Sequence, residues 1–160
     1  MKAASERVAQ ALRALGIEPE IVEFAQSTRT ADEAARAVGT ELGQIVKSLV
    51  FTAGGQPLLA LVSGANRASP SLLSAAAGAT IERADAATVR AATGYAIGGV
   101  APVGHPTAIA VFLDEDLLRY DVVYAAAGTP NSVFPIDPRD LARITSARVV
   151  ALKDTGAELG

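Results

Sequence analysis

The sequence predicts an α+β fold, with a mixed, mainly antiparallel sheet or partial barrel and helices packed outside it. Two observations lead to this prediction. Short apolar runs rich in β-branched residues recur along the chain, separated mostly by hairpin-length turns and without regular β-α-β alternation. Helical patterns with recognisable start and stop signals lie between these runs. The chain has 160 residues, which fits a single domain over residues 1–160 with a core of its own.

Five segments carry helix signals. Three of them begin with a capping pattern: Thr30 followed by Glu33 in a capping box, and a cap residue followed by proline at 69–70 and 137–138. Glycines end most of these patterns, as expected for a helix C-terminus. Helices are therefore expected at Ser5–Leu15, Thr30–Val38, Ser71–Ala77, Asp85–Ala92 and Asp137–Ile144.

Strands are expected where short apolar runs lie between turn residues. The clearest pair is Ile45–Thr52 and Pro57–Val62, which flank Gly54-Gly55 and form a hairpin signature. Asp114–Leu118 is expected to be a turn or a single helical turn. The remaining strand candidates are Glu20–Phe24, a brief strand at Ile81, Thr107–Leu113, Val122–Ala126, Val133–Ile136 and Val149–Leu152.

The composition excludes several kinds of chemistry. The chain has no cysteine, which excludes disulfides, thiolate metal sites and a cysteine nucleophile. A single histidine, His105, makes a histidine zinc site or a Ser-His-Asp triad hard to build, so we expect neither metal nor cofactor. The net charge of −3 argues against a broad basic face for DNA.

The sequence also predicts where the protein works. No stretch approaches the roughly eighteen apolar residues of a membrane span. The N-terminal segment has no signal-peptide core. A cytoplasmic protein with no membrane partner is expected.

A glycine- and proline-rich loop, Gly94–Pro106, is the most unusual segment of the chain. It contains four glycines and two prolines, yet its other residues are mostly apolar, unlike an ordinary surface loop. Within it, Gly98, Gly99, Val100, Ala101 and Pro102 offer main-chain N–H groups with little side-chain bulk. Such a stretch suits a ligand carbonyl, carboxylate or phosphate. The alternative is a packed connection whose glycines only serve its turns.

Lys47 is the most informative single residue. Side chains alternate along a strand, so Lys47 shares a face with Ile45, Leu49 and Phe51. An ammonium group on an apolar face is costly without a partner. It is either an edge-strand or snorkelling lysine, or a cation at the rim of an apolar pocket that faces an anionic or carbonyl-bearing ligand.

Other polar residues have both a structural and a functional interpretation. Turn formation alone explains Ser63–Asn66, although Arg67 has the guanidinium group that binds phosphate in bidentate fashion. A lone loop histidine such as His105 is more often structural than a general base. The further candidates for substrate binding are Thr30, whose best explanation is capping, and Gly128, Thr129 and Asn131 in a turn between two strands.

Taken together, these residues resemble the YbaK/ProXp family, the free-standing relatives of the editing domain inserted in bacterial prolyl-tRNA synthetases. The resemblance runs from about Ser27 to Leu152. The motifs that carry it are Ser27–Ala31, Gly43–Phe51, Ser63–Arg67, Thr93–Pro106, Asp114–Leu118 and Ala126–Pro130. The chain departs from the family pattern at Ala68 and Ser69 after Asn-Arg, and at Asn131 after Gly-Thr-Pro. The last difference concerns pocket size or polarity.

The resemblance implies hydrolysis of the ester bond in mischarged aminoacyl-tRNA, chiefly tRNA for proline carrying alanine, cysteine or another small amino acid. It implies a mixed barrel-like sheet with helices around it. The family's key lysine falls on Lys47, and its Gly-x-x-x-Pro loop falls on Gly98–Pro102. The expected partners are the acceptor end of mischarged tRNA and a prolyl-tRNA synthetase, with the protein a monomer or a homodimer.

The chemistry that follows from this resemblance needs no metal. Loop amides of Gly98–Pro102 would stabilise the oxyanion, Lys47 would anchor a phosphate of the terminal adenosine, and water would be the nucleophile. This scheme requires Lys47 and the loop to face one hollow. The alternatives are a non-catalytic module that binds a nucleotide or the tRNA acceptor end, and a factor that works only within a synthetase complex.

Overall fold

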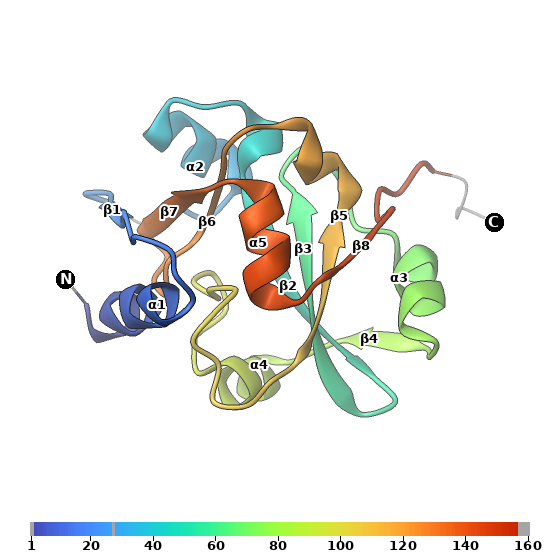
Figure 1. Ribbon diagram of the computed structural model, residues 1–160. Coiled ribbons are helices and arrows are strands. Elements are labelled where there is room, and N and C mark those ends of the chain that lie inside the picture. The colour runs from blue at the N-terminus through green and yellow to red at the C-terminus, as the bar shows by residue number, and fades with distance from the viewer. Residues whose placement is uncertain (1, 27, 157–160) are drawn as a thin grey trace.

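The computed structural model describes residues 2–26 and 28–156, and Figure 1 shows its ribbon. All five predicted helices form. They are α1 (Ala3–Ala14), α2 (Ala31–Val38), α3 (Pro70–Ala77), α4 (Ala86–Thr93) and α5 (Pro138–Thr145), with short 3-10 helices η1 (Leu42–Gln44) and η2 (Glu115–Arg119). Ser27, which opens one of the motifs quoted above, lies outside the described residues.

The strands form two sheets, as an α+β fold requires. The larger sheet has the order β4-β2-β3-β5-β8 and the smaller has the order β1-β7-β6. The pairings are antiparallel except for β3 with β5 and β5 with β8. The strands are β1 (Val22–Glu23), β2 (Val46–Ala53), β3 (Gln56–Ser63), β4 (Ile81–Arg83), β5 (Ala110–Asp114), β6 (Val123–Ala126), β7 (Ser132–Ile136) and β8 (Arg148–Val150).

The predicted fold class is confirmed, and the sheets do not close into a barrel in the described part of the chain. The two sheets meet at a parallel bridge between Ile45 and Tyr124.

The strand predicted from Thr107 begins only at Ala110, which pairs with Leu58. The preceding β3 residue is Pro57, which has no N–H to donate, so the parallel ladder cannot start earlier from that side.

The larger sheet packs against two separate clusters of buried residues, with α5 lying in front of the sheet and α3 near β8 in Figure 1. On one face, Val50 of β2 belongs to the main core, together with residues of α1, α5 and the Gly94–Pro106 loop. On the other face, Phe51 belongs to a second cluster with Leu73 of α3. Alternation along β2 therefore directs Lys47 toward the α3 side and Ser48 toward the loop side.

Candidate active site

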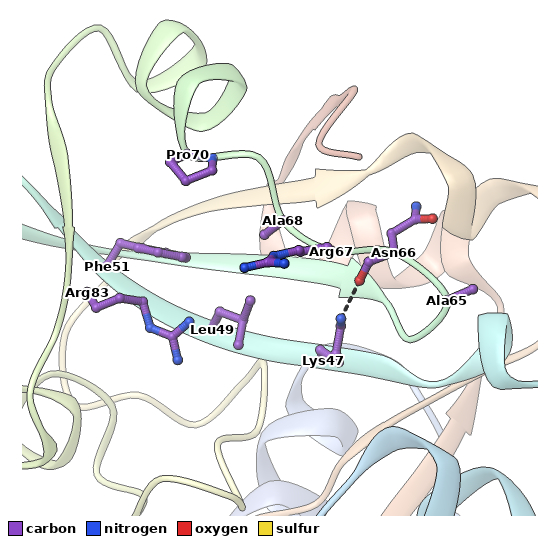
Figure 2. A pocket seen from close by; sticks show the side chains of 9 residues that line it. All are labelled: Lys47, Leu49, Phe51, Ala65, Asn66, Arg67, Ala68, Pro70 and Arg83. Atoms are coloured by element: carbon purple, nitrogen blue, oxygen red, sulfur yellow. Dashed lines mark hydrogen bonds between the residues drawn. The ribbon is translucent and has the colours of Figure 1, made fainter. Parts of the chain in front are cut away.

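A pocket of about 580 Å³ lies on the α3 side of β2 (Figure 2). Its apolar wall consists of Leu49 and Phe51, and three cationic side chains surround it: Lys47, Arg67 and Arg83. Ala65, Asn66, Ala68 and Pro70 complete the lining, which contains no carboxylate. An apolar wall with three cations and no acid suits an anionic ligand that also carries a flat or apolar group.

Lys47 lines this pocket, and its ammonium group is held by the main chain. Its ammonium group donates a hydrogen bond to the main-chain oxygen of Asn66, drawn as a dashed line in Figure 2. Partial burial lowers the pKa of Lys47 below its usual 10.5, and the Asp114 carboxylate partly opposes this shift. Lys47, Leu49 and Phe51 line one pocket, which fits the predicted apolar face with a cation at its rim.

The segment that carries Arg67 is fixed by a buried carboxylate. Asp114 is fully buried and accepts hydrogen bonds from the Ser63 main-chain N–H at 3.0 Å and the Asn66 side-chain amide at 2.8 Å. The same amide nitrogen also donates to Asp116 at 2.8 Å. An amide nitrogen has only two hydrogens, so Asn66 offers the pocket its main-chain oxygen and not its side-chain donors.

A smaller pocket of about 60 Å³ lies on the loop side of β2. Gly98 and Val100 of the glycine loop form one wall, and Ser48 and Val50 of β2 form another. Its remaining lining residues are Leu49, Arg83, Ala84, Val89 and Ile97. The loop thus lines a cavity whose side chains are apolar except for Ser48 and Arg83.

The loop amides are only partly used within the protein. The N–H of Gly99 donates to the Ala96 oxygen at 3.1 Å, whereas Pro102 has no N–H. The N–H groups of Gly98, Val100 and Ala101 have no hydrogen-bond partner among the described residues. Val100 and Ala101 are buried, and unpaired buried amides are costly, so these groups suit a bound acceptor.

The loop is held in place from behind. The Tyr95 hydroxyl donates to the Val103 oxygen at 2.7 Å, and Nε2 of His105 donates to the Ala101 oxygen at 2.8 Å. Arg7 of α1 lies over the Tyr95 ring, 4.6 Å from its centroid, and donates to the Gly94 oxygen at 2.7 Å. Helix α1 therefore stabilises the loop without lining either pocket.

Lys47 and the glycine loop line two adjoining pockets, so their convergence on one site stays a prediction. Lys47 lines the larger pocket, and Gly98 and Val100 line the smaller one. The cause is strand alternation, which places Lys47 and the loop on opposite faces of β2. The two pockets nevertheless adjoin, because Leu49 and Arg83 line both of them.

Several predicted substrate-binding residues have structural partners and lie outside both pockets. Thr30 caps α2 by accepting from the Glu33 N–H at 3.1 Å, and the buried Ser63 hydroxyl donates to the Gly43 oxygen at 2.7 Å. His105 contacts the back of the loop, where its pKa is lowered mainly by burial. For these side chains the structure favours the structural interpretation.

The turn at residues 128–131 lies against the glycine loop. A Cβ added to Gly99 would lie 2.8 Å from Cα of Thr129, so the two backbones are in direct contact. The Thr129 hydroxyl donates to Asn131 Oδ1 at 2.9 Å, and Asn131 donates to the Phe24 oxygen at 3.0 Å. A Cβ on Gly128 would lie 3.0 Å from main-chain atoms of Ala4 in α1.

The sequence analysis missed Ser48, Arg83 and Asp114. Arg83 reaches the site because β4 pairs with β2 opposite Phe51, a long-range pairing that no local pattern indicates. Asp114 is the last residue of the otherwise apolar strand β5, and a carboxylate in that position is a signal that sequence analysis can use. Ser48 was passed over because strand alternation assigns it to the face opposite Lys47.

Among the described residues, no group of three or more His, Cys, Asp or Glu side chains is placed to bind a metal ion. The helices described here are also too short or too polar to cross a bilayer.

The fold carries two adjoining pockets whose linings suit an anionic ligand with a small group attached. Residues 25–144 match the family model of the aminoacyl-tRNA editing domain. A crystal structure assigned as a trans-editing enzyme for prolyl-tRNA synthetase is 46% identical, with a TM-score of 0.93 over 96% of this chain and 99% of the other.

Two curated relatives agree with this match. The uncharacterized protein YwhH of Bacillus subtilis is 31% identical over 82% of this chain and 85% of its own length. EbsC of Enterococcus faecalis, assigned as a Cys-tRNA(Pro)/Cys-tRNA(Cys) deacylase, is 28% identical over 74% of each chain. The chain belongs to the aminoacyl-tRNA editing domain family. Editing removes the amino acid from its tRNA, so this is an enzyme of the aminoacyl-tRNA deacylase class.

Proposed function

We propose that the protein is a trans-editing hydrolase whose substrate is tRNA(Pro) carrying a small non-cognate amino acid such as alanine or cysteine. One observation carries the proposal: a cationic pocket of nucleotide size adjoins a small apolar pocket formed in part by a glycine loop. A mischarged tRNA end needs both, because it joins a polyanionic nucleotide to a small aminoacyl group.

The larger pocket would bind the acceptor end. Its volume of about 580 Å³ lies within the usual range for small-molecule sites, roughly 300–1,000 Å³. Phe51 contributes to the apolar wall, and the Arg83 guanidinium, which lies over the Phe51 ring 5.5 Å from its centroid, would bind phosphate or a base. Lys47 and Arg67 would bind phosphate oxygens, Arg67 in bidentate fashion.

The smaller pocket would hold the amino-acid side chain. Its volume is about 60 Å³. One molecule occupies about 30 Å³ in liquid water, so the pocket has room for a short side chain. A rigid apolar wall rejects larger groups by steric exclusion more readily than it rejects smaller ones. Small non-cognate residues are thereby favoured over the bulkier ring of proline.

The unpaired loop amides would stabilise the negative charge that develops on the ester oxygen during hydrolysis. The N–H groups of Gly98 and Val100, which line the smaller pocket, would bind the ester carbonyl, whose oxygen becomes negative as water attacks. An aminoacyl ester is already activated, so stabilised charge and correct orientation suffice without a metal or a side-chain base. His105 does not serve as the base here, because its Nε2 is bound to the Ala101 oxygen behind the loop.

The relatives support the choice of tRNA. The assignment of the 46%-identical structure names prolyl-tRNA synthetase, and that of EbsC names Cys-tRNA(Pro). A prolyl-tRNA synthetase is therefore the proposed macromolecular partner. The synthetase would contact the phosphate backbone of the tRNA body. A chain of net charge −3 makes such contacts only in part.

A deacylation panel tests the proposal. Purified protein is incubated with tRNA(Pro) and tRNA(Ala), each carrying alanine, serine, cysteine, 2-aminobutyrate or proline, and loss of the amino acid is followed against the protein-free rate. Hydrolysis of tRNA(Pro) carrying a small residue, with Pro-tRNA(Pro) spared, is expected. A protein that slows the spontaneous loss in every case is a binding module and contradicts the proposal.

A further inference from the structure

One side chain of helix α1, that of Arg7, contacts the glycine loop near both of its ends. The guanidinium group donates a hydrogen bond to the Gly94 oxygen at 2.7 Å, at the point where α4 ends and the loop begins. A Cβ added to Gly104, near the other end of the loop, would lie 3.7 Å from Cγ of Arg7. The apolar stem of the arginine therefore packs beside the end of the loop while its charged group holds the beginning.

The middle of the loop is linked to the same side chain through Tyr95. The guanidinium lies over the Tyr95 ring, 4.6 Å from its centroid, and the ring is buried. The Tyr95 hydroxyl donates to the Val103 oxygen at 2.7 Å. Since Val103 directly follows Gly98–Pro102, this bond closes the loop just behind the stretch that carries the unpaired amides.

The stretch itself has little that fixes it relative to β2, which forms the opposite wall of the smaller pocket. The Gly99 N–H donates to the Ala96 oxygen, a bond within the loop, and the N–H groups of Gly98 and Val100 have no partner among the described residues. Bonds inside a loop maintain its shape but not its place against a neighbouring strand. The position of these amides therefore depends on contacts from outside the loop.

Helix α1 also holds the turn against which the loop rests. The buried Ser5 hydroxyl donates to the Ala127 oxygen at 2.8 Å, and a Cβ on Gly128 would lie 3.0 Å from main-chain atoms of α1. The next residue, Thr129, is the one that Gly99 contacts backbone to backbone. One helix thus fixes both the loop and its support.

We infer that Arg7 is a positioning residue for the hydrolysis, which places the loop amides through its hydrogen bond to Gly94 and does not touch the substrate. The inference rests on the proposed function and deepens it, because it gives α1 a part in the chemical step. The match to the editing-domain model covers residues 25–144, so α1 lies outside it. Amides stabilise an oxyanion only at hydrogen-bond distance, so a small displacement lowers kcat and leaves nucleotide binding in the larger pocket intact.

The test is single-turnover deacylation of tRNA(Pro) carrying alanine or cysteine, over a range of enzyme concentrations in excess of the tRNA. Arg7→Met keeps an apolar stem without charge or donor, whereas Arg7→Lys keeps both. We expect Arg7→Met to lower the rate constant at saturation about five- to tenfold, with the half-saturating enzyme concentration unchanged, and Arg7→Lys to lose clearly less. At saturation with excess enzyme the rate constant does not depend on the fraction of protein that is folded.

Arg148→Met is the matched control. Arg148 is exposed, as Arg7 is, lies over the Phe112 ring at 5.5 Å from its centroid, and donates to the Ala76 oxygen at 2.7 Å. It lines neither pocket. The substitution therefore removes the same charge and the same two kinds of contact, and it should change neither the rate constant nor the half-saturating concentration.

The possible contradictions are distinct. An unchanged rate constant in Arg7→Met, or an equal fall in Arg148→Met, refutes the role of Arg7 and leaves the proposed function standing. A change confined to the half-saturating concentration shows that Arg7 contacts the tRNA itself, and a lysine variant as slow as the methionine variant refutes the role of the hydrogen bond to Gly94. Failure of the wild type to hydrolyse either substrate refutes the proposed function, and the inference with it.

Discussion

The two faces of β2 carry different kinds of binding group. On the α3 side, Lys47 joins exposed arginines around a wide pocket, so the interactions come from long side chains. On the loop side, Ser48 faces a cavity about one tenth as large, where the main chain of Gly98 and Val100 provides the wall. One strand thus separates a flexible, cationic region from a small and rigid one through the alternation of its residues.

The difference predicts where the molecule tolerates change. Long cationic side chains can move to fit a phosphate, and losing one leaves the others in place. The smaller pocket depends on backbone position, and the loop contacts Thr129 so closely that no side chain fits between. Substitutions on the loop side should therefore affect the chemical step, and those on the α3 side should mainly affect substrate affinity.

The largest effect is expected for Gly99→Ala. The new Cβ would lie 2.8–2.9 Å from main-chain atoms of Thr129, so the loop must move and its amides lose their positions. Losing an oxyanion contact typically lowers kcat by about 100-fold or more. Single-turnover deacylation of mischarged tRNA(Pro) under saturating enzyme measures this loss directly.

Gly78→Ala is the matched control for this loop variant. Gly78 has φ +72 with open space around its Cβ position, so alanine there strains the backbone by about 1–2 kcal/mol at the end of α3, outside both pockets. It should lower the free energy of unfolding but leave kcat unchanged. Equal activity of Gly99→Ala and Gly78→Ala would remove the loop from the catalytic scheme.

A smaller effect, concentrated in KM, is expected for Lys47→Ala. The lysine lies on the α3 side and would bind phosphate, so the ester itself is positioned from the other face. A hydrogen bond to a charged group is worth about 1.5–3 kcal/mol, which corresponds to a rise in KM of roughly 10- to 100-fold. Steady-state kinetics with mischarged tRNA(Pro) separate KM from kcat.

The control is Lys153→Ala, which removes an exposed lysine outside both pockets and keeps the change in net charge the same. It should leave KM close to that of the wild type. A Lys47 variant that loses kcat at unchanged KM would show that the ammonium group acts on the reacting ester. The division of labour between the two faces of β2 would then be wrong.

Local features of the fold, and one face of the site, were predictable from the sequence. The Thr30 side-chain cap of α2 and the Gly54-Gly55 hairpin both form, because each depends only on residues a few positions apart. The shared face of Lys47, Leu49 and Phe51 follows from strand periodicity alone.

The parts that were not predictable depend on long-range packing. Arg83 joins both pockets through the pairing of β4 with β2, and Arg7 supports the loop through Tyr95. The placement of Lys47 and the loop on opposite faces depends on which side of the sheet the loop packs. A family resemblance identified both as important, but it contained no information about the strand that separates them.

The smallest effect is expected when His105, behind the glycine loop, is replaced. The quantity affected is the pH dependence of the free energy of unfolding. Burial lowers the pKa of His105 below 6.5, Arg7 adds to this, and the bond to the Ala101 oxygen partly opposes it. Below about pH 6.5 the unfolded chain therefore binds a proton that the folded protein refuses, so stability falls as the pH decreases through the lowered pKa. Replacing the histidine with a group that does not titrate removes this contribution.

Urea unfolding of the wild type and His105→Gln between pH 7.5 and 5 measures it. Carboxylates affect both proteins alike, and the chain has no other histidine, so the difference between the two profiles reports His105 alone. The wild type should lose more free energy of unfolding over this range than the variant does. Parallel profiles would mean that His105 titrates as it does in the unfolded chain, and that the back of the loop is open to water.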